Sequence, residues 1–389
     1  MLALRVATFP LLAEEVKAAA PDPVVVEVDN VPDSKKLPLH AWLDIDGKFD
    51  DNIFISHTNK KSDFIWSLSP GVSYESSEPD LNKRNYVLLS YSPTFQLFTD
   101  HTTEDAIDQD ALLRYRYMDD KVTFTLSQTY KQLTDSLIET GGRVRWDDYG
   151  TDVVLSYLLM EKNHLELDLN QKVVDYHTPG YLDYNQWQAG LFWLYDLSPV
   201  LTLGFGPNFG WVDVDQAPNH NFEQILARLN YQPTEKISIA LRGGVEFRQY
   251  EGPNANELVL PVASMDASYQ PFDGTKLTLG VYREVHPSSL IGNEVYVDTG
   301  VRAAIHQRFC QSLDLGLTGG YDNSDYSSTQ STASANRADD YYFIRPSLDV
   351  LVAKWWKIGC YYEYRTNDSN IPAFSFDNNQ AGIQTSFNY

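Results

Sequence analysis

Cysteine and basic residues are scarce in this sequence of 389 residues, and each shortage excludes a class of protein. The two cysteines, Cys310 and Cys360, are too few for a disulfide scaffold or for a cysteine-type zinc site. Lys and Arg together number 30 against 53 Asp and Glu, which gives a formal net charge of -23. A chain this acidic would repel a phosphate backbone, so nucleic acid is not expected as a partner.

Long hydrophobic runs are missing as well. No stretch approaches the roughly 18 consecutive apolar residues of a transmembrane helix, and the longest apolar patches, such as residues 153–160, are interrupted by polar residues. Hydrophobic residues nevertheless make up 43% of the chain and aromatic residues 13%, which is ample for a folded core and excludes a disordered chain. No helix of ordinary length is indicated anywhere.

The dominant pattern from Leu39 onward has a period of two. In residues 237–248 one parity is apolar, as at Leu241 and Phe247, while the other carries charge, as at Arg242 and Glu246. The same alternation recurs at residues 122–130, 165–170 and 312–318. A period of two is that of a β-strand with one apolar and one polar face. About 18 strands of about 10 to 14 residues are predicted, an even number as in bacterial outer-membrane barrels.

Connections between the predicted strands alternate in length. Short polar turns are predicted at residues 118–121, 160–164, 197–200, 232–236, 270–276 and 353–357, and longer connections at residues 50–63, 99–109, 214–221, 322–339 and 366–379. In an up-and-down meander all short turns fall on one rim and all long loops on the other. This favours a single closed transmembrane antiparallel β-barrel in the bacterial outer membrane, with short periplasmic turns and long extracellular loops. A soluble β-sandwich or β-propeller remains an alternative, although no propeller-like repeat is found.

The two ends of the chain differ from the barrel. Residues 1–36 are interpreted as a leader or flexible periplasmic arm, and residues 37–389 as the outer-membrane β-barrel. The last strand ends on alternating aromatic residues, Phe387 and Tyr389, and this ending resembles the assembly signal that the barrel-assembly machinery reads in outer-membrane proteins. Cys360 shares the apolar parity of its strand and Cys310 lies at a turn, so the two cysteines are expected to be unbonded.

If the apolar parity faces lipid, the opposite parity lines the barrel interior. The predicted pore-lining residues are Asp44, Asp46, Lys48, Arg114, Arg116, Glu166, Asp168, Lys172, Arg228, Arg242, Glu246, Arg248, Asp298, Arg302, Glu363 and Arg365. Acids and bases are nearly balanced in this set, so most of the net charge is expected in loops and turns. A mixed polar wall suits hydrated carbohydrate and other small solutes, because it offers both donors and acceptors.

Catalytic and metal-binding patterns are absent from the sequence. The eight histidines lack the spacing of a metal site, and Gly204, Gly206 and Gly210 are not followed by the helix that a dinucleotide site needs. We therefore expect no enzyme, no catalytic residue, no metal and no cofactor. The acidic pairs Asp50 with Asp51 and Asp322 with Asp325 are interpreted as solvated loop residues, with divalent bridging to lipopolysaccharide or glycan as the alternative.

The opening of the barrel region resembles a known family. Residues 49–54 (FDDNIF), 61–65 (KSDFI), 68–72 (LSPGV) and 89–93 (LSYSP) are similar to the start of the family named Putative beta-barrel porin 2. The resemblance implies an outer-membrane conduit for capsule or exopolysaccharide export that acts with a periplasmic polysaccharide-export protein. A general or sugar-type diffusion porin for small solutes remains the alternative. Expected partners are outer-membrane lipid and lipopolysaccharide, the barrel-assembly machinery and the polysaccharide substrate.

Overall fold

The alternating segments form β-strands along the whole described chain. The computed structural model describes residues 38–76, 84–251, 257–290, 295–327 and 336–389. Their strands are β1 (Leu39–Asp50), β2 (Asp63–Glu75), β3 (Asn85–Phe98), β4 (Ala106–Met118), β5 (Val122–Leu137), β6 (Gly142–Met160), β7 (Asn163–Tyr176), β8 (Tyr184–Ser198), β9 (Leu201–Val214), β10 (His220–Thr234), β11 (Ile237–Tyr250), β12 (Glu257–Tyr269), β13 (Thr275–Pro287), β14 (Val295–Phe309), β15 (Leu313–Ser327), β16 (Ala338–Ala353), β17 (Trp356–Ser369) and β18 (Phe376–Asn388). Two single-turn 3-10 helices, η1 (Thr102–Glu104) and η2 (Pro372–Phe374), lie in loops. Within these described segments, no helix has both the length and the apolar character that crossing a membrane requires.

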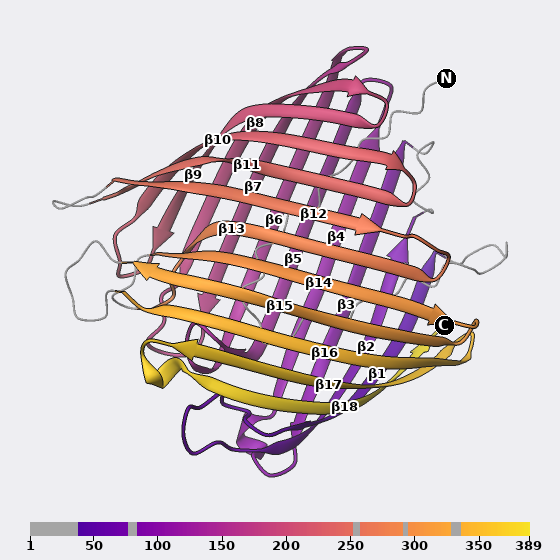
Figure 1. Ribbon diagram of the computed structural model, residues 1–389, viewed down its shortest axis with the longest axis vertical. Helices are drawn as coiled ribbons and strands as arrows, with labels where there is room; N and C mark the ends of the chain where they lie inside the picture. The colour runs from indigo at the N-terminus through magenta and orange to yellow at the C-terminus, as the bar shows by residue number, and fades with distance from the viewer. Residues whose placement is uncertain (1–37, 77–83, 252–256, 291–294, 328–335) are drawn as a thin grey trace.

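The sheet closes on itself. Each strand pairs antiparallel with the next one in sequence, and β18 returns to pair with β1, with Ile45 opposite Thr385. Closure leaves no edge strand at the ends of the sheet, which in a hydrocarbon environment would expose unpaired backbone groups. The predicted closed barrel of 18 antiparallel strands is therefore confirmed (Figure 1).

The two faces of the wall have opposite character. Along β10, Gln224 and Arg228 point inward and are buried, whereas Ile225 between them points outward and is 45% exposed. Strand pairing carries this parity around the barrel, since residues opposite each other share a face. Large apolar side chains such as Trp193 and Phe205 are exposed on the outside. An apolar outer face and a polar inner face are what a barrel in a membrane needs.

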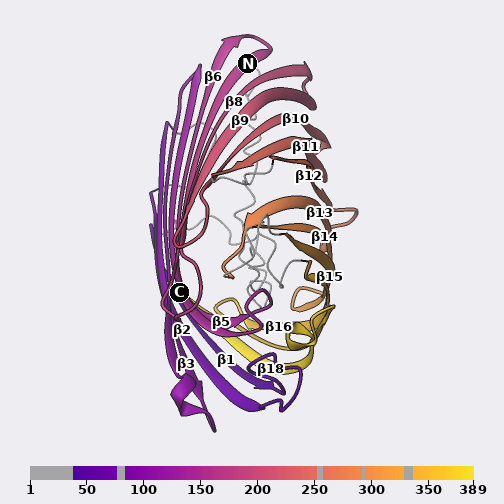
Figure 2. The same cartoon turned by 90° about the vertical axis from the view of Figure 1, so that its left-hand side faces the viewer.

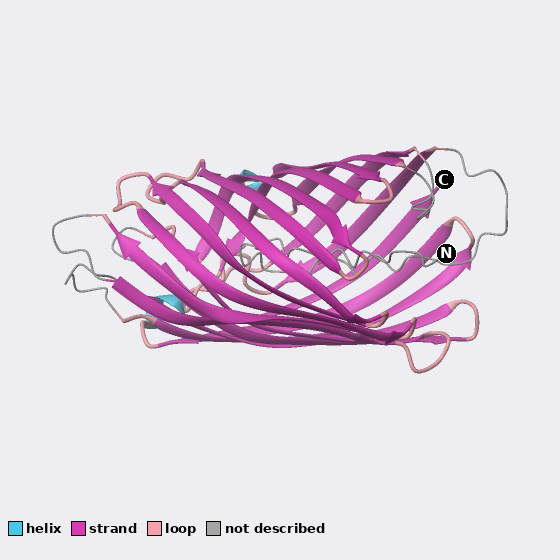
Figure 3. Cartoon of the chain, turned by 90° about the horizontal axis from the view of Figure 1, so that it is seen from above, coloured by secondary structure: helices cyan, strands magenta, loops and turns pink. Residues whose placement is uncertain are grey.

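The barrel is flattened rather than round. Viewed along its shortest axis, the wall formed by β10–β18 lies in front of the wall formed by β1–β8, and the strands of the two walls cross at a large angle (Figure 1). The view turned by 90° shows the oval section between the two walls (Figure 2). Seen from above, the strands are tilted relative to the barrel axis (Figure 3). Closure of a sheet into a barrel requires such a tilt.

The two rims differ as predicted, with local corrections. Most turns on one rim, here called the short-turn rim, are brief, as at residues 161–162 and 235–236; the loops on the other rim, here called the long-loop rim, are longer. The predicted loops 322–339 and 366–379 are too long, because β15 continues to Ser327 and β17 continues to Ser369. The ends of β15 and β17 carry polar residues on both faces of the sheet. The apolar alternation that predicts a strand therefore ends before the hydrogen-bonded strand itself does. The predicted leader, residues 1–36, lies outside the described residues.

Candidate functional site

The barrel interior is the candidate site, and the structure places every predicted pore-lining residue on its inner face. Those residues are Asp44, Asp46, Lys48, Arg114, Arg116, Glu166, Asp168, Lys172, Arg228, Arg242, Glu246, Arg248, Asp298, Arg302, Glu363 and Arg365. The parity of each strand alone sufficed to find them. That they line a conducting pore stays a prediction.

Arg228 on β10 is the centre of one charged network on this face. Its guanidinium donates hydrogen bonds to Glu166 (2.9 Å) and Asp168 (2.6 Å) on β7, and lies 3.2 Å from the ring centroid of Phe192 on β8. The arginine reaches across two intervening strands because Gly204 on β9 has no side chain there. A Cβ at Gly204 would lie only 3.3 Å from the Cβ of Arg228 and 2.5 Å from Leu194. The glycines of β9 thus serve lumenal packing, as their lack of a following helix suggests.

A second network joins β10 to β11. Glu246 accepts hydrogen bonds from Arg248 (2.7 Å) and from the amide of Gln224 (2.7 Å), and Gln224 in turn accepts one from Arg242 (3.2 Å). Glu246 and Arg248 are each 1% exposed. Ion pairs buried to this degree need such additional hydrogen bonds to offset their lost hydration.

A third network closes the seam between β1, β17 and β18. Arg365 donates to Asn378 (2.6 Å), whose amide donates to Asp50 (2.6 Å), and Gln380 donates to the other oxygen of Asp50 (2.8 Å). Asp50 and Asp51 both accept hydrogen bonds from the side-chain amide of Asn378 on β18, so they are not solvated as expected. For the other acidic pair the expectation is wrong for Asp322, which is buried on the inner face of β15, whereas Asp325 has the opposite parity and is exposed.

The inner wall is more acidic than the sequence predicts. Strand pairing adds further charged residues to the inner face, and more of them are acids than bases. The acids are Asp50, Asp63, Glu75, Asp108, Asp110, Asp135, Asp148, Asp152, Asp196, Asp266, Glu284, Asp314, Asp322, Asp339 and Asp349, and the bases are Lys131, Lys276, Arg308, Arg345 and Lys357. The prediction of a nearly balanced wall is therefore wrong, because it omits segments with a weaker alternation.

Two hairpins bend into the interior on the long-loop side, although β14 of the second stays paired with β15 up to Val295 opposite Ser327. The end of the β5–β6 hairpin, residues 136–141, is here called the overhanging tip; its Ile138 packs on Ile55 of the first loop and on Tyr341 and Phe376 of the opposite wall. The upper part of β13 and β14 curves into the barrel in the same way (Figure 2). Val285, Val295 and Val297 of that hairpin pack inside the barrel. Both hairpins thus place apolar clusters inside the barrel on the long-loop side.

Glu139 and Arg337 hold these segments together. The carboxylate of Glu139 accepts hydrogen bonds from the hydroxyl of Ser288 (2.8 Å) and the backbone N–H of Ser289 (2.7 Å). Arg337 donates to the carbonyl oxygens of Glu139 (2.7 Å) and Ile138 (3.0 Å) and pairs with Asp339. Burial raises the pKa of the Glu139 carboxyl above its ordinary value. Sequence reasoning missed both residues, since Glu139 stands in a four-residue connection with the composition of a polar turn.

The remaining predicted positions are peripheral to the interior. Cys310 in the β14–β15 turn and Cys360 on the outer face of β17 are exposed and unbonded, as predicted. Phe387 stacks on Trp355 and Trp356 on the outer surface of the short-turn rim. Tyr389 exchanges backbone hydrogen bonds with Ala41. Their role as an assembly signal stays a prediction. In the described part of the chain, no group of three or more His, Cys, Asp or Glu side chains is placed to hold a metal ion.

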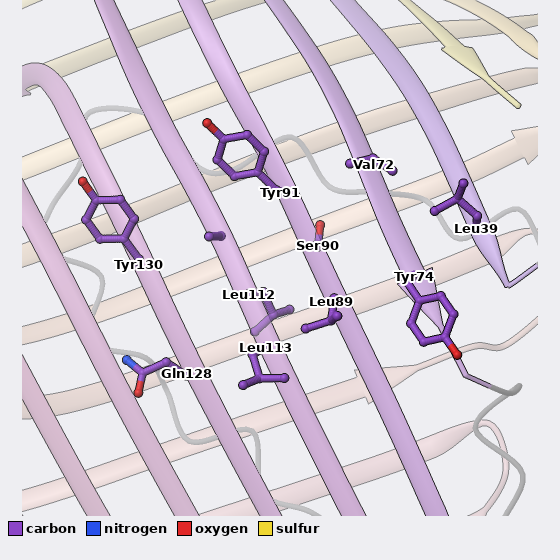
Figure 4. A pocket seen from close by; sticks show the side chains of 11 residues that line it. Leu39, Val72, Tyr74, Leu89, Ser90, Tyr91, Leu112, Leu113, Gln128 and Tyr130 are labelled. Carbon is purple, nitrogen blue, oxygen red and sulfur yellow. The ribbon is translucent and has the colours of Figure 1, made fainter.

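A hollow on the outer surface is a separate feature. Its lining comes from β1 to β5 and is mainly apolar, with Leu39, Tyr74, Leu89, Leu113 and Tyr130 around it (Figure 4). These residues belong to the face that contacts hydrocarbon, so the hollow is part of the membrane surface and not of the interior.

Several solved structures resemble this barrel at low sequence identity. OccK2 (OpdF) of Pseudomonas aeruginosa is 11% identical, with a TM-score of 0.50 over 90% of this chain and 98% of that chain. OccK9 (OpdG) and OpdK of the same organism are each 9% identical over 90% of this chain, with 98% and 99% of those chains covered and TM-scores of 0.49 and 0.48. At such identity the likeness concerns the fold. No curated protein matches the sequence.

The closed barrel, its apolar exterior and its likeness in fold to OccK2 (OpdF) define the class: the chain is a bacterial outer-membrane β-barrel. The family model described as Putative beta-barrel porin 2 matches residues 234–389, from the end of β10 through β18. This is the family that the opening motifs resemble, but the matched residues lie in the other half of the chain from those motifs.

Proposed function

We propose that the protein is a passive diffusion porin for small hydrophilic solutes and that it favours neutral and cationic solutes over anions. The observation that carries the proposal is the inner face of the barrel, which is mainly polar outside the buried apolar clusters and carries more acids than bases, against an apolar outer face. Carboxylate-rich pore walls attract cations and repel anions. No chemical step is required, so the proposal is a channel rather than an enzyme.

Local pairing refines this selectivity. Arg228 and Arg248 are occupied by Glu166 and Glu246, so their positive charges are compensated within the wall. Asp44 on β1 and Asp266 on β12 both lie on the inner face, on strands that are far apart in the sheet. Such acids contribute negative potential to the interior, which raises the local concentration of cations.

The test is ion selectivity in planar lipid bilayers. Purified protein under a potassium chloride gradient should give a reversal potential of the sign that indicates preference for potassium. The double variant D44N/D266N should move the potential toward zero, whereas D44E/D266E, which keeps both charges, should leave it near the wild-type value. Anion preference, or the absence of any conductance, would contradict the proposal.

A polysaccharide-export conduit is the second candidate, favoured by the resemblance of the opening motifs to a family with export-associated members. A polymer would need a continuous passage through the outer half of the interior, where the overhanging tip packs on the opposite wall. Export also requires a periplasmic partner at the short-turn rim. Deletion of the gene should then abolish surface polysaccharide, and a deletion strain with normal surface polysaccharide would exclude export while leaving the porin proposal intact.

A further inference from the structure

The wall of the barrel is split between β12 and β13 on the long-loop side. The two strands pair only from Ala263 opposite Arg283 down to Tyr269 opposite Leu277. Above this point β12 continues upward to Glu257, paired with β11 alone. β13 continues to Pro287, paired with β14 alone. Each strand thus presents one edge without a strand partner, an arrangement that membrane barrels otherwise avoid.

The part of β13 and β14 beyond the split lies inside the barrel, with β14 still paired to β15 as far as Val295 opposite Ser327, so that the split is on the β12 side alone. We call it the inner hairpin (residues 284–290 and 295–297). Its Val285, Val295 and Val297 join a buried cluster with Leu226 on β10 and Val262 on β12, both of which point inward. In Figure 2, β13 leaves the wall and curves into the space between the two walls.

The sequence of the inner hairpin is nonetheless that of a wall hairpin. Val285, Val295 and Val297 have the same parity as Val281 and Val301, which face outward lower on the same strands and are exposed. The opposite parity is polar, with Glu284, His286 and Asp298. If the inner hairpin lay in the wall, its valines would face lipid and its polar residues would face the interior.

The upper part of β12 is compatible with the inner hairpin either inside the barrel or in the wall. Leu258, Leu260 and Val262 point inward and are apolar, and they pack against the buried cluster that holds the inner hairpin. They therefore supply a dry contact for the hairpin when it lies inside. On the outward parity, Val259 is 57% exposed and so continues the apolar exterior up to the split.

We propose that the inner hairpin is a gate, which exchanges between the inside position and a position in the wall where β13 pairs with the upper part of β12. The proposal rests on the proposed channel function, since the wall position would clear the outer half of the interior. Continuing the existing register gives the pairs of this second state: Val262 with Glu284, Leu260 with His286, and Leu258 with Ser288. In the wall position, backbone hydrogen bonds along the seam take the place of the apolar packing inside the barrel.

Glu139 is the latch that holds the inside position. Its carboxylate binds Ser288 and Ser289 at the end of the inner hairpin. The carbonyl of Ser289 also accepts a hydrogen bond from the backbone N–H of Leu182 (2.8 Å). Both contacts must break when Ser288 moves next to Leu258 in the wall.

Disulfide trapping tests the exchange without reference to conduction. In a C310S/C360S background, L260C/H286C places two thiols directly opposite each other only when the seam is paired, at a separation that a disulfide can span. We expect this disulfide to form under mild oxidation in outer membranes, and to form about tenfold faster when E139A is added, because that variant removes the two hydrogen bonds that the Glu139 carboxylate accepts from Ser288 and Ser289. S264C/Y282C, within the existing ladder, is the positive control, and L258C/E284C, out of register, is the negative control. Failure of L260C/H286C to cross-link while S264C/Y282C does so would overturn the gate.

Conductance of the trapped states separates the gate from the channel. The oxidised L260C/H286C protein should conduct several-fold more than its reduced form. The oxidised E139C/S288C protein, which fixes the latch, should conduct less than its reduced form. If the seam disulfide forms but the trapped protein does not conduct, the exchange is supported and the channel function fails. If the seam-trapped and latch-trapped proteins conduct equally, the exchange does not gate the channel.

Discussion

Two hairpins enter the interior of this barrel, but they do so in different ways. β5 and β6, with 16 and 19 residues, are long, and the β4–β5 ladder reaches Gln109 opposite Gln132 before the overhanging tip bends inward. β13 has only 13 residues, and it reaches the interior by leaving a neighbour, β12, that continues without it. The first hairpin is an extension beyond a nearly complete wall, whereas the second is a piece of the wall that has been displaced. Only the second leaves an edge to which it can return.

The part of the wall that holds the Arg228 network should respond most strongly to mutation. The charged side chains of this network are largely buried and stand on strands that are paired along their length. R228A would leave Glu166 and Asp168 without their buried partner, which typically costs about 3 to 5 kcal/mol. The barrel should therefore unfold at a clearly lower temperature, measured by the heat-dependent shift in gel mobility. R308A removes a more exposed pair with Asp314 and should cost about 1 kcal/mol or less. Equal effects of the two variants would contradict the assignment of Arg228 as a structural centre.

Loss of Arg337 should loosen the long-loop rim while sparing the wall. Its side chain is 1% exposed and donates to two carbonyl oxygens of the overhanging tip. R337A should therefore raise hydrogen exchange at residues 138–141 by about tenfold or more, with little change in the unfolding temperature of the barrel. A protected tip in R337A would show that the apolar contacts of Ile138 alone hold it in place.

Glu139 should make the same rim sensitive to pH. Burial raises the pKa of its carboxyl in the folded rim, so the folded form binds a proton that the unfolded form releases as pH rises past the ordinary glutamate range. Local stability should therefore be greatest at acidic pH and should fall as pH rises toward the folded pKa. Hydrogen exchange at Ser289 across this range measures the effect. E139Q keeps an acceptor for Ser288 and Ser289 without the titration, so its exchange should be flat over the same range; a slope equal to wild type would assign the pH dependence to another group.

The smallest expected effect concerns the chain end. F387A removes the stack on Trp355 and Trp356 at the surface of the short-turn rim. Folded protein should lose about 1 kcal/mol, while the amount assembled in outer membranes should fall several-fold if Phe387 is part of the assembly signal. A normal amount of F387A protein in outer membranes would show that Phe387 is not part of the assembly signal.

The sequence predicts the wall and misses the hairpins inside the barrel for one reason. Period two, followed strand by strand, suffices to place residues such as Asp46, Arg242 and Glu363 on the inner face, because a closed barrel leaves only two faces. The inner hairpin has the alternation of a wall strand, so nothing local marks its displacement. Glu139 contacts Ser288 and Arg337, which are 149 and 198 positions away in the sequence. Such contacts form only because particular hairpins bend into the barrel, and the strand pattern does not show which hairpins bend. The acidity of the wall was missed because acids such as Asp152, Asp266 and Asp349 stand in segments whose alternation is weaker, although strand pairing puts them on the inner face.

Solute flux through the reconstituted wild-type protein tests the central claim, that the interior is a path for small hydrophilic solutes, most directly. Proteoliposomes transferred into isotonic solutions of neutral sugars should swell, with a rate that falls steeply from a monosaccharide to a trisaccharide and reaches zero for a dextran. The same preparation with E139A should swell faster for every permeant sugar, because the inner hairpin is then no longer latched. Vesicles that do not swell in a monosaccharide, with or without E139A, would contradict the account.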